Sequence, residues 1–199
     1  MAAGNPDAGS RQQGDKNQMI SRRWITAFFV LFLLALTVVG CAGEAAQPAE
    51  AEAAAIYAAV IRQIYTEDDT FGGTLQPPRL YVVGATDDSA GDPETEESDP
   101  AIITDSVRQD VSGRLADLPT ETVWVETRDE VALDPETGAV ADEGAIITLG
   151  NIHLQGDETV HVPASIYVAG LAAGGQTYVL EEVDGAWTVT GNTGVEWIS

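Results

Sequence analysis

Two histidines, His153 and His161, are the only imidazoles in the chain, and a short acidic turn separates them. The apolar residues on both sides of the turn alternate, and they share one sheet face only when Leu154 lies opposite Val160. This register needs an odd-length loop at residues 156–158 and places His153 directly opposite His161. Cross-strand Cβ atoms are about 4.5 to 5.5 Å apart, so both imidazoles could bind one zinc ion.

A zinc site needs a third protein ligand, and the neighbouring Asn151 is a poor one. We therefore interpret His153 and His161 as ordinary imidazoles on the less apolar face of the sheet, with metal binding as the minor alternative. A two-residue turn at this hairpin would place the imidazoles on opposite faces and remove that alternative. We expect no cofactor.

The segment 86–99 is rich in carboxylates, which are the ligands that calcium prefers. Its seven acids are Asp87, Asp88, Asp92, Glu94, Glu96, Glu97 and Asp99. The spacing of an EF-hand fails, because the twelfth position counted from Asp87 is Ser98 instead of Glu. We interpret the segment as a solvated acidic loop and keep a cation-dependent structural or adhesion module as an alternative.

Sequence motifs for catalysis are missing. No Ser stands in a Gly-x-Ser-x-Gly elbow, and neither His has a nucleophile beside it. The pairs Gly72-Gly73 and Gly174-Gly175 lack the Lys-Ser/Thr that follows a phosphate-binding loop, so both are interpreted as turns. We predict no catalytic residue and consider an enzyme the less favoured class.

The chain is strongly acidic, with 32 Asp and Glu against 9 Lys and Arg and a formal net charge of -23. Such a charge cannot provide the basic surface that binds phosphates, which argues against a nucleic-acid partner. A single cysteine also excludes an intramolecular disulfide. Beyond Cys41 the 32 acids less Asp7 and Asp15 leave 30 against five arginines, a net charge of -25.

A charge-free run of 15 residues, 25–39, directly follows Arg22 and Arg23. It matches the hydrophobic region of a signal peptide and is shorter than the about 20 apolar residues that span a bilayer. The run ends in the tetrapeptide Val38-Val39-Gly40-Cys41. This tetrapeptide resembles the lipobox of bacterial lipoproteins.

The resemblance implies that the leader is cleaved before Cys41 and that its sulfur carries a diacylglyceryl group, with palmitate-type chains. Two or three acyl chains anchor a protein firmly, at about 0.8 kcal/mol per buried methylene. The chain would then be bound to the cell membrane on its extracytoplasmic face. The alternative is a free Cys41 thiol on an uncleaved membrane helix.

Residues 1–40 therefore form a polar leader and a signal peptide, and Met19 is a second candidate for the true start. Residues 21–25, Ser-Arg-Arg-Trp-Ile, also resemble a twin-arginine export motif, so the general secretory and twin-arginine routes both stay open.

After the tether 41–48, one α+β domain is expected over 49–199, made of two amphipathic helices on an antiparallel meander of five or six strands, possibly cone-shaped. The first helix starts at Ala49 and ends near Asp68. The second takes Asp99 as its N-cap and ends before Pro119. Strands are predicted at 79–85, 122–125, 145–154, 159–171, 177–183 and 186–190, with a turn at 134–138.

The last hairpin turns at Asp184-Gly185, which pairs Leu180 with Val189 and Tyr178 with Gly191. Tyr178, Leu180, Trp187 and Val189 then share a core face that the first helix can cover. Residues 178–189 are similar to the closing hairpin of nuclear-transport-factor-two-like domains, which implies a cone-shaped α+β fold. Pro163 within its strand indicates an edge or a bulge.

Together these features predict an exported, lipid-anchored module that binds an unidentified protein or small ligand at the outer face of a bacterial membrane. A small pocket-containing enzyme or a ligand-binding cone is the main alternative. An acid within hydrogen-bond reach of either His in a deep pocket would favour the enzyme.

Overall fold

The computed structural model describes residues 47–67, 73–95, 98–155 and 158–199. The chain divides into two compact units, Met1–Ala45 and Ala46–Ser199, and the described residues belong to the second. Several predicted residues therefore lie outside them: Arg22, Arg23, Val38, Val39, Gly40 and Cys41. Within the described ranges, no helix has the length and apolar character needed to cross a membrane.

Helix α2, Glu50–Thr66, confirms the first predicted helix. Its apolar positions recur every three or four residues, and this stripe is buried over its whole length from Ala54 to Tyr65. Glu50 and Glu52 lie in its first turn, where a carboxylate is favoured by the helix dipole.

Helix α3, Asp105–Arg114, is shorter than predicted, and the predicted N-cap Asp99 was wrong. Thr104 caps the helix instead, because its hydroxyl accepts a hydrogen bond from the Val107 amide at 3.4 Å. The preceding residues are extended: Ile102 forms an antiparallel bridge with Ala85, and the Ile103 amide donates to the Gly84 carbonyl at 2.9 Å. Residues 102 and 103 are therefore paired with the end of β1 in an extended conformation, and the helix starts at Asp105 instead of directly after Asp99.

The strands form one seven-stranded sheet in the order β2-β1-β3-β5-β6-β7, with β4 also paired to β5. Their bounds are β1 Arg79–Val83, β2 Glu121–Val125, β3 Ala145–Leu149, β4 His153–Leu154, β5 Thr159–Ala169, β6 Ala172–Val183 and β7 Ala186–Ile198. The α+β class is confirmed. The sheet is mixed, however, because β1 pairs in parallel with both β2 and β3, so the prediction of a purely antiparallel meander was wrong. The chain crosses over through α3 between β1 and β2, and residues 126–144 cross back over β1 to reach β3, so all three strands run in the same direction.

The predicted strand 145–154 is two strands separated by a bulge opposite Pro163. Leu149 pairs with Ala164 and His153 with His161, so the β3–β4 side has one residue more than β5. Pro163 has no amide hydrogen to donate, and its carbonyl accepts from the Gly150 amide at 2.6 Å. Pro163 therefore does mark a bulge, in the facing strand, while β5 itself lies inside the sheet.

The two predicted hairpin registers are confirmed near their turns. His153 pairs with His161 and Leu154 with Val160, and Leu180 pairs with Val189 beside the Asp184 turn. Farther along, a shift between Val179 and Leu180 places Tyr178 opposite Asn192 instead of Gly191. A bulge in β7 causes this shift.

Strands β6 and β7 are longer than predicted, and Gly174-Gly175 lies within β6 instead of in a turn. Gly175 pairs with Trp197, and a Cβ at this position would lie 2.6 Å from the indole Nε1 and 2.1 Å from the Ala90 carbonyl oxygen. The glycine is required by this close packing.

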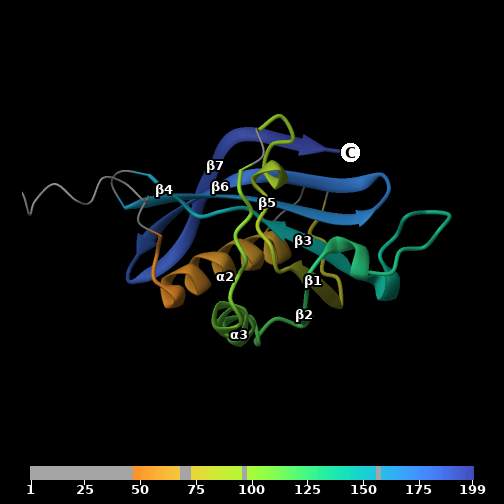
Figure 1. The fold of residues 1–199 in the computed structure, drawn as a ribbon, viewed down its shortest axis with the longest axis horizontal. Helices are drawn as coiled ribbons and strands as arrows, with labels where there is room; N and C mark the ends of the chain where they lie inside the picture. Colours follow the sequence, from red (N-terminus) through yellow and green to blue (C-terminus); the bar gives the residue numbers. More distant parts are fainter. Residues whose placement is uncertain (1–46, 68–72, 96–97, 156–157) are drawn as a thin grey trace, which may run out of the picture. The chain divides into compact units, whose positions relative to one another are not determined.

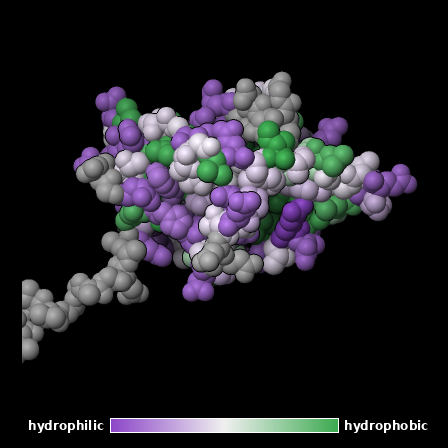
Figure 2. Space-filling view, turned by 90° about the horizontal axis from the view of Figure 1, so that it is seen from above, coloured by the Kyte–Doolittle hydropathy of each residue, from purple (hydrophilic) through white to green (hydrophobic). Residues whose placement is uncertain are grey.

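Both helices pack on one face of the sheet, as Figure 1 shows for α2 along the strands and α3 beyond it. The main core joins the apolar faces of α2 and α3 to the inner residues of β1, β3, β5 and β6. Trp187 and Val189 pack against it, which confirms that the first helix covers the last hairpin. The visible face in Figure 2 is largely polar, with small separate apolar patches.

Candidate functional site

The candidate site lies where the parallel strands β1 and β3 end. After β1 the chain leads through α3 to β2 on one side, while β3 lies on the other side of β1. Crevices at the carboxyl ends of parallel strands, where the connections diverge, are the usual ligand sites of such sheets. Here the segment after β1, residues 84–104, meets residues 150–152 after β3.

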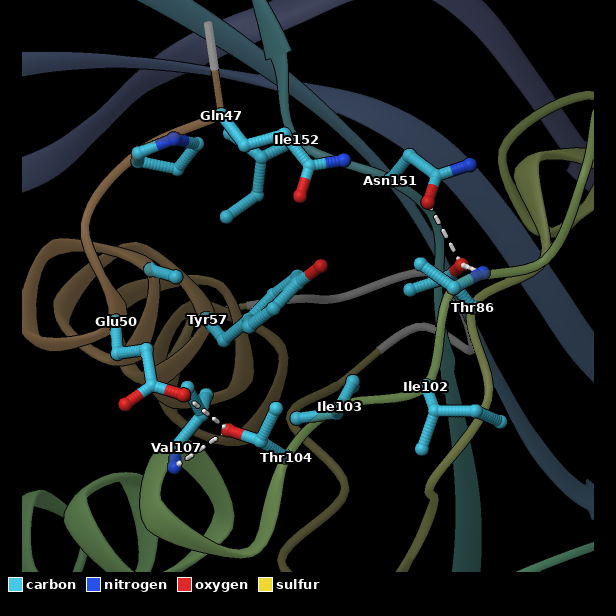
Figure 3. A pocket seen from close by; sticks show the side chains of 13 residues that line it. Gln47, Glu50, Tyr57, Thr86, Ile102, Ile103, Thr104, Val107, Asn151 and Ile152 are labelled. Carbon is cyan, nitrogen blue, oxygen red and sulfur yellow. Dashed lines mark hydrogen bonds between the residues drawn. The ribbon is translucent and has the colours of Figure 1, made fainter.

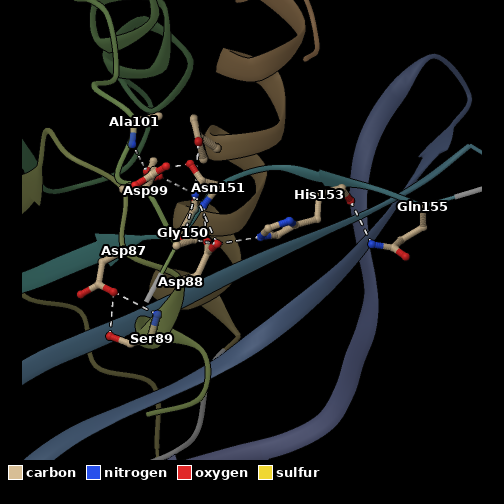
Figure 4. A network of polar contacts seen from close by, with 12 residues as sticks. Asp87, Asp88, Ser89, Asp99, Ala101, Gly150, Asn151, His153 and Gln155 are labelled. Atoms are coloured by element: carbon tan, nitrogen blue, oxygen red, sulfur yellow. Dashed lines mark hydrogen bonds and ion pairs between the residues drawn. The ribbon is translucent and has the colours of Figure 1, made fainter. Parts of the chain in front are cut away.

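Asp88 is the buried centre of a polar network at this edge (Figure 4). It starts the 3-10 helix Asp88–Ala90, and its side chain is 4% exposed. One carboxylate oxygen, Oδ1, accepts from the Asn151 amide at 2.6 Å. The other, Oδ2, accepts from the Ser98 hydroxyl at 2.6 Å, from Asn151 Nδ2 at 3.2 Å, and contacts His153 Nε2 at 3.0 Å. One carboxylate therefore joins the ends of β3 and β4 to the acidic loop.

Burial on its own would raise the pKa of Asp88. Hydrogen bonds from Ser98 and Asn151, together with the charge of His153, outweigh burial and hold the pKa of Asp88 below its usual value. Asp88 is therefore ionised at neutral pH. In the sequence it was grouped with the solvated acids of the loop, and that interpretation was wrong for Asp88, because the protein around it supplies the donors that water would otherwise provide.

A second set of hydrogen bonds continues from Asn151. The Thr86 hydroxyl donates to Asn151 Oδ1 at 2.7 Å and accepts from the Ala101 amide at 2.7 Å. Asn151 Nδ2 also lies 3.2 Å from the Ser98 hydroxyl and 3.5 Å from the Asp99 carbonyl. These bonds fix the segment before α3 against the end of β3.

A pocket of about 140 Å³ opens beside this network, between the start of α2 and the segment before α3 (Figure 3). The ring of Tyr57 forms its middle, and the Tyr57 hydroxyl donates to the Gly150 carbonyl at 3.2 Å. Burial, and secondarily the charge of Asp88, raises the pKa of Tyr57, so its hydroxyl stays protonated. Ile102, Ile103 and Ile152 supply apolar walls, and Thr86 and Asn151 separate the pocket from Asp88.

Arg108 of α3 holds one wall of the pocket in place. Its Nε donates to the Ile103 carbonyl at 2.7 Å, and its Nη2 donates to the Gly84 carbonyl at 3.3 Å. The guanidinium also pairs with Glu126 at 2.6 Å and lies over the Trp124 ring at 5.7 Å. This single side chain connects α3, the ends of β1 and β2, and the pocket wall.

The two histidines are cross-strand neighbours as predicted, and His153 Nε2 contacts the Asp88 carboxylate at 3.0 Å. The His153 side chain is 45% exposed. Asn151, the poor third ligand, is bound to Asp88 instead. Within the described ranges, no group of three or more His, Cys, Asp or Glu side chains could hold a metal ion.

The polar groups near His153 are not in the order that nucleophilic catalysis needs. A nucleophile donates to the histidine, which in turn donates to the acid. Here the Ser98 hydroxyl donates to Asp88, so Asp88 lies between Ser98 and His153. His153 is also not among the residues that line the pocket. The acid partner expected of the enzyme alternative is present at His153, outside the lining of the pocket beside Tyr57.

Thr86, Asp88 and Asn151 were not predicted as site residues from the sequence. One signal could have found them: Asp88 follows strand 79–85 and Asn151 lies within the predicted strand 145–154, near its true break. Their convergence depends on β1 and β3 being parallel neighbours, which the sequence did not indicate.

Comparisons with protein-family models, with curated proteins and with solved structures found no match for this chain. Its function has to be inferred from its own residues and their geometry.

Proposed function

We propose that this chain is an exported lipoprotein, anchored through Cys41 at the outer face of a bacterial membrane, whose domain binds a small ligand or a partner's side chain in the pocket beside Tyr57. The observation that carries the binding role is the pocket itself, at the divergent carboxyl ends of β1 and β3 and supported by the Asp88 network.

The anchor is supported by the lipobox-like tetrapeptide at 38–41 and the charge-free run before it. Gln47 lines the pocket and lies six residues after Cys41. An extended chain spans about 3.3 to 3.6 Å per residue, so the pocket rim would stay within roughly 20 Å of the lipidated sulfur. The ligand would be bound close to the membrane surface.

A binding role is supported by the way the site is built. Ile102 is 67% exposed at the pocket, although the rest of that segment is fixed by hydrogen bonds. A large apolar side chain on a rigid rim is available for contact with a ligand. The nearby carboxylate and imidazole are engaged with each other in an order that supports structure instead of nucleophilic attack.

The anchor is tested by replacing Cys41 with Ser in the full chain expressed in bacteria. We expect wild type to incorporate labelled palmitate and to sediment with membranes, and C41S to lose the label and retain its leader. Unchanged processing and sedimentation of C41S would contradict the anchor.

The pocket is tested on the detergent-solubilised full chain with three probes of similar size: butylamine, 1-butanol and butyrate. Saturation-transfer NMR should detect binding of at least one probe to wild type. I152W, which fills the pocket, should abolish that signal, whereas the control I198W, at an exposed position in β7, should retain it. Equal signals from both variants, or none from wild type, would contradict binding at this pocket.

A further inference from the structure

The pocket beside Tyr57 has acidic charge and no basic charge. Among its thirteen lining residues, Glu50 carries a carboxylate and none is Lys, Arg or His. The Glu50 carboxylate accepts from the Thr104 hydroxyl at 2.9 Å, which leaves further lone pairs on both oxygens. In Figure 3 it lies at the end of the pocket between the starts of α2 and α3.

The hydroxyl donors of the pocket and the Asn151 side-chain amide are already engaged. The Thr86 hydroxyl donates to Asn151, and the Asn151 amide donates to Asp88 and Asp99. The Tyr57 hydroxyl donates to the Gly150 carbonyl. The Thr104 hydroxyl donates to Glu50. Accepting capacity remains on Glu50 and on the Tyr57 oxygen, and the neutral Gln47 amide can both donate and accept. A ligand that donates hydrogen bonds fits this set better than one that accepts them.

The negative potential extends into the pocket from behind it. The ionised Asp88 carboxylate lies beyond Thr86 and Asn151 and contributes to the raised pKa of Tyr57, so its charge acts at the Tyr57 hydroxyl. Beyond the pocket, the chain after Cys41 carries a net charge of -25 and attracts cations over about a Debye length.

Two helix N-termini face the same region and would favour an anion on their own. Each already has carboxylates in its first turn: Glu50 and Glu52 in α2, and Asp105 in α3. These carboxylates offset the positive ends of both helix dipoles, and Glu50 is the one formally charged residue of the pocket lining.

The pocket size fits a short alkyl chain. A cavity of about 10 to 15 Å³ holds one water, so a pocket of about 140 Å³ accommodates a chain of several heavy atoms, such as a butyl group with one nitrogen. The ring of Tyr57 with Ile103 and Ile152 gives the methylenes of such a chain apolar contact.

We propose that the pocket binds a primary alkylammonium group of the size of a lysine side chain, with its methylenes against Tyr57 and Ile152 and its nitrogen at Glu50. This assignment rests on the proposed function and adds the chemical class of the ligand. A lysine of a basic partner protein and a free alkylamine share this chemistry.

The test measures the affinity of the detergent-solubilised full chain for butylamine, 1-butanol and butyrate by NMR titration at low salt. Butylamine should bind at least tenfold more tightly than either of the others. E50Q should weaken butylamine binding severalfold and leave 1-butanol binding unchanged. E52Q is the matched control: Glu52 is in the same helical turn, is absent from the pocket lining, and its replacement removes the same charge. It should change butylamine affinity less than twofold.

Two peptide measurements distinguish a lysine of a partner protein from a free alkylamine. A decapeptide with one central lysine should bind more tightly than butylamine if the ligand is a partner's side chain, and its norleucine analogue should bind at least tenfold more weakly than the lysine peptide. Tighter butylamine than lysine-peptide binding would identify a free amine. Both results support the alkylammonium class.

The assignment is overturned if butyrate or 1-butanol binds as tightly as butylamine, or if E50Q and E52Q weaken butylamine equally, which would show general attraction to an acidic surface. If I152W still abolishes probe binding in that case, the binding pocket stands and only the ligand class is wrong. If no probe binds wild type, both proposals fail.

Discussion

At the scale of single residues, Asp88 is the group on which the site depends most. Its carboxylate receives hydrogen bonds from two segments that are more than 50 residues apart along the chain, 98 and 151, through Ser98 and Asn151. Hydrogen bonds to a charged group are stronger than neutral ones, and the Asp88 carboxylate that accepts them is buried.

Replacing Asp88 with Asn should therefore destabilise the domain. The backbone N–H and the side-chain Nδ2 of Asn151 donate to different oxygens of Asp88, and the new amide keeps only one oxygen. One of these two donors would therefore lose its acceptor, at a cost of about 2 kcal/mol in unfolding free energy. Urea unfolding measures this change. D99N, an exposed acid of the same loop, is the control and should change stability by less than about 0.5 kcal/mol. Equal effects of D88N and D99N would contradict a structural role for Asp88.

The Asp88 carboxylate also makes the unfolding free energy depend on pH, and its lowered pKa fixes the direction of that dependence. A carboxyl group with a lower pKa in the folded than in the unfolded chain binds fewer protons when folded. Its stabilisation is present above the ordinary Asp pKa of about 3.9 and is lost as the pH falls through the lower folded value. The difference in unfolding free energy between wild type and D88N should thus decrease as the pH falls below about 4. Urea unfolding at a series of pH values from about 5 to about 2 checks this, and a difference that grows over this range would contradict it.

At the scale of elements, close approaches decide where the strands and the loop after β1 can lie. Trp197 of β7 donates from Nε1 to the Ala90 carbonyl at 3.0 Å, across Gly175 of β6. This contact holds the 3-10 helix of Asp88 against the sheet. This packing leaves no room for a side chain at residue 175.

Gly175→Ala should destabilise the domain by about 1 to 3 kcal/mol, the usual cost of overpacking, because its Cβ would clash with the Ala90 carbonyl and the Trp197 indole. Thermal unfolding measures the loss. The matched control is Gly191→Ala in β7, where a Cβ meets nothing within 4 Å. If both variants melt at the same temperature, the proposed packing at Gly175 is wrong.

Helices and strands could be predicted well where the apolar residues repeat regularly over many positions. The buried stripe of α2 was evident from residues 56, 57, 60, 61, 64 and 65, and the His153–His161 register followed from alternation alone. The start of α3 could not be predicted, because Asp99-Pro100 is a good local start signal. Tertiary bonds from Gly84 and Ala85 to residues 102–103 compete with it.

At the scale of the whole molecule, the acidic charge acts on stability as well as on partners. The arginines are few, and those that form ion pairs do so with specific acids, among them Arg62 with Asp117 at 2.6 Å and Arg79 with Glu121 at 2.7 Å. Most carboxylates are therefore balanced by no basic group of the chain, and like charges repel each other in a compact fold.

Salt should consequently stabilise the domain at neutral pH. Raising NaCl from 10 mM to 500 mM at pH 7 screens this repulsion, and we expect a gain of about 1 kcal/mol, or roughly 2 to 4 °C in melting temperature. Near pH 4.1, the isoelectric point of the full 199-residue sequence, the same addition should have a smaller effect, because protonation of the carboxylates has lowered the net charge. Differential scanning calorimetry gives both values. An equal salt effect at both pH values would show that repulsion is not its cause.

The sequence by itself determined the α+β class, the main helical stripe, the strand segments and the two hairpin registers, because these depend on periodicity and turn residues that act over a few positions. It also supplied the lipobox hypothesis, which is a linear signal. Only the tertiary structure decided that β1 lies in parallel between β2 and β3, and hence that Asp88, Asn151 and Tyr57 meet at one edge. Long-range strand pairing depends on how the whole chain buries its apolar surface, which no local pattern of residues encodes.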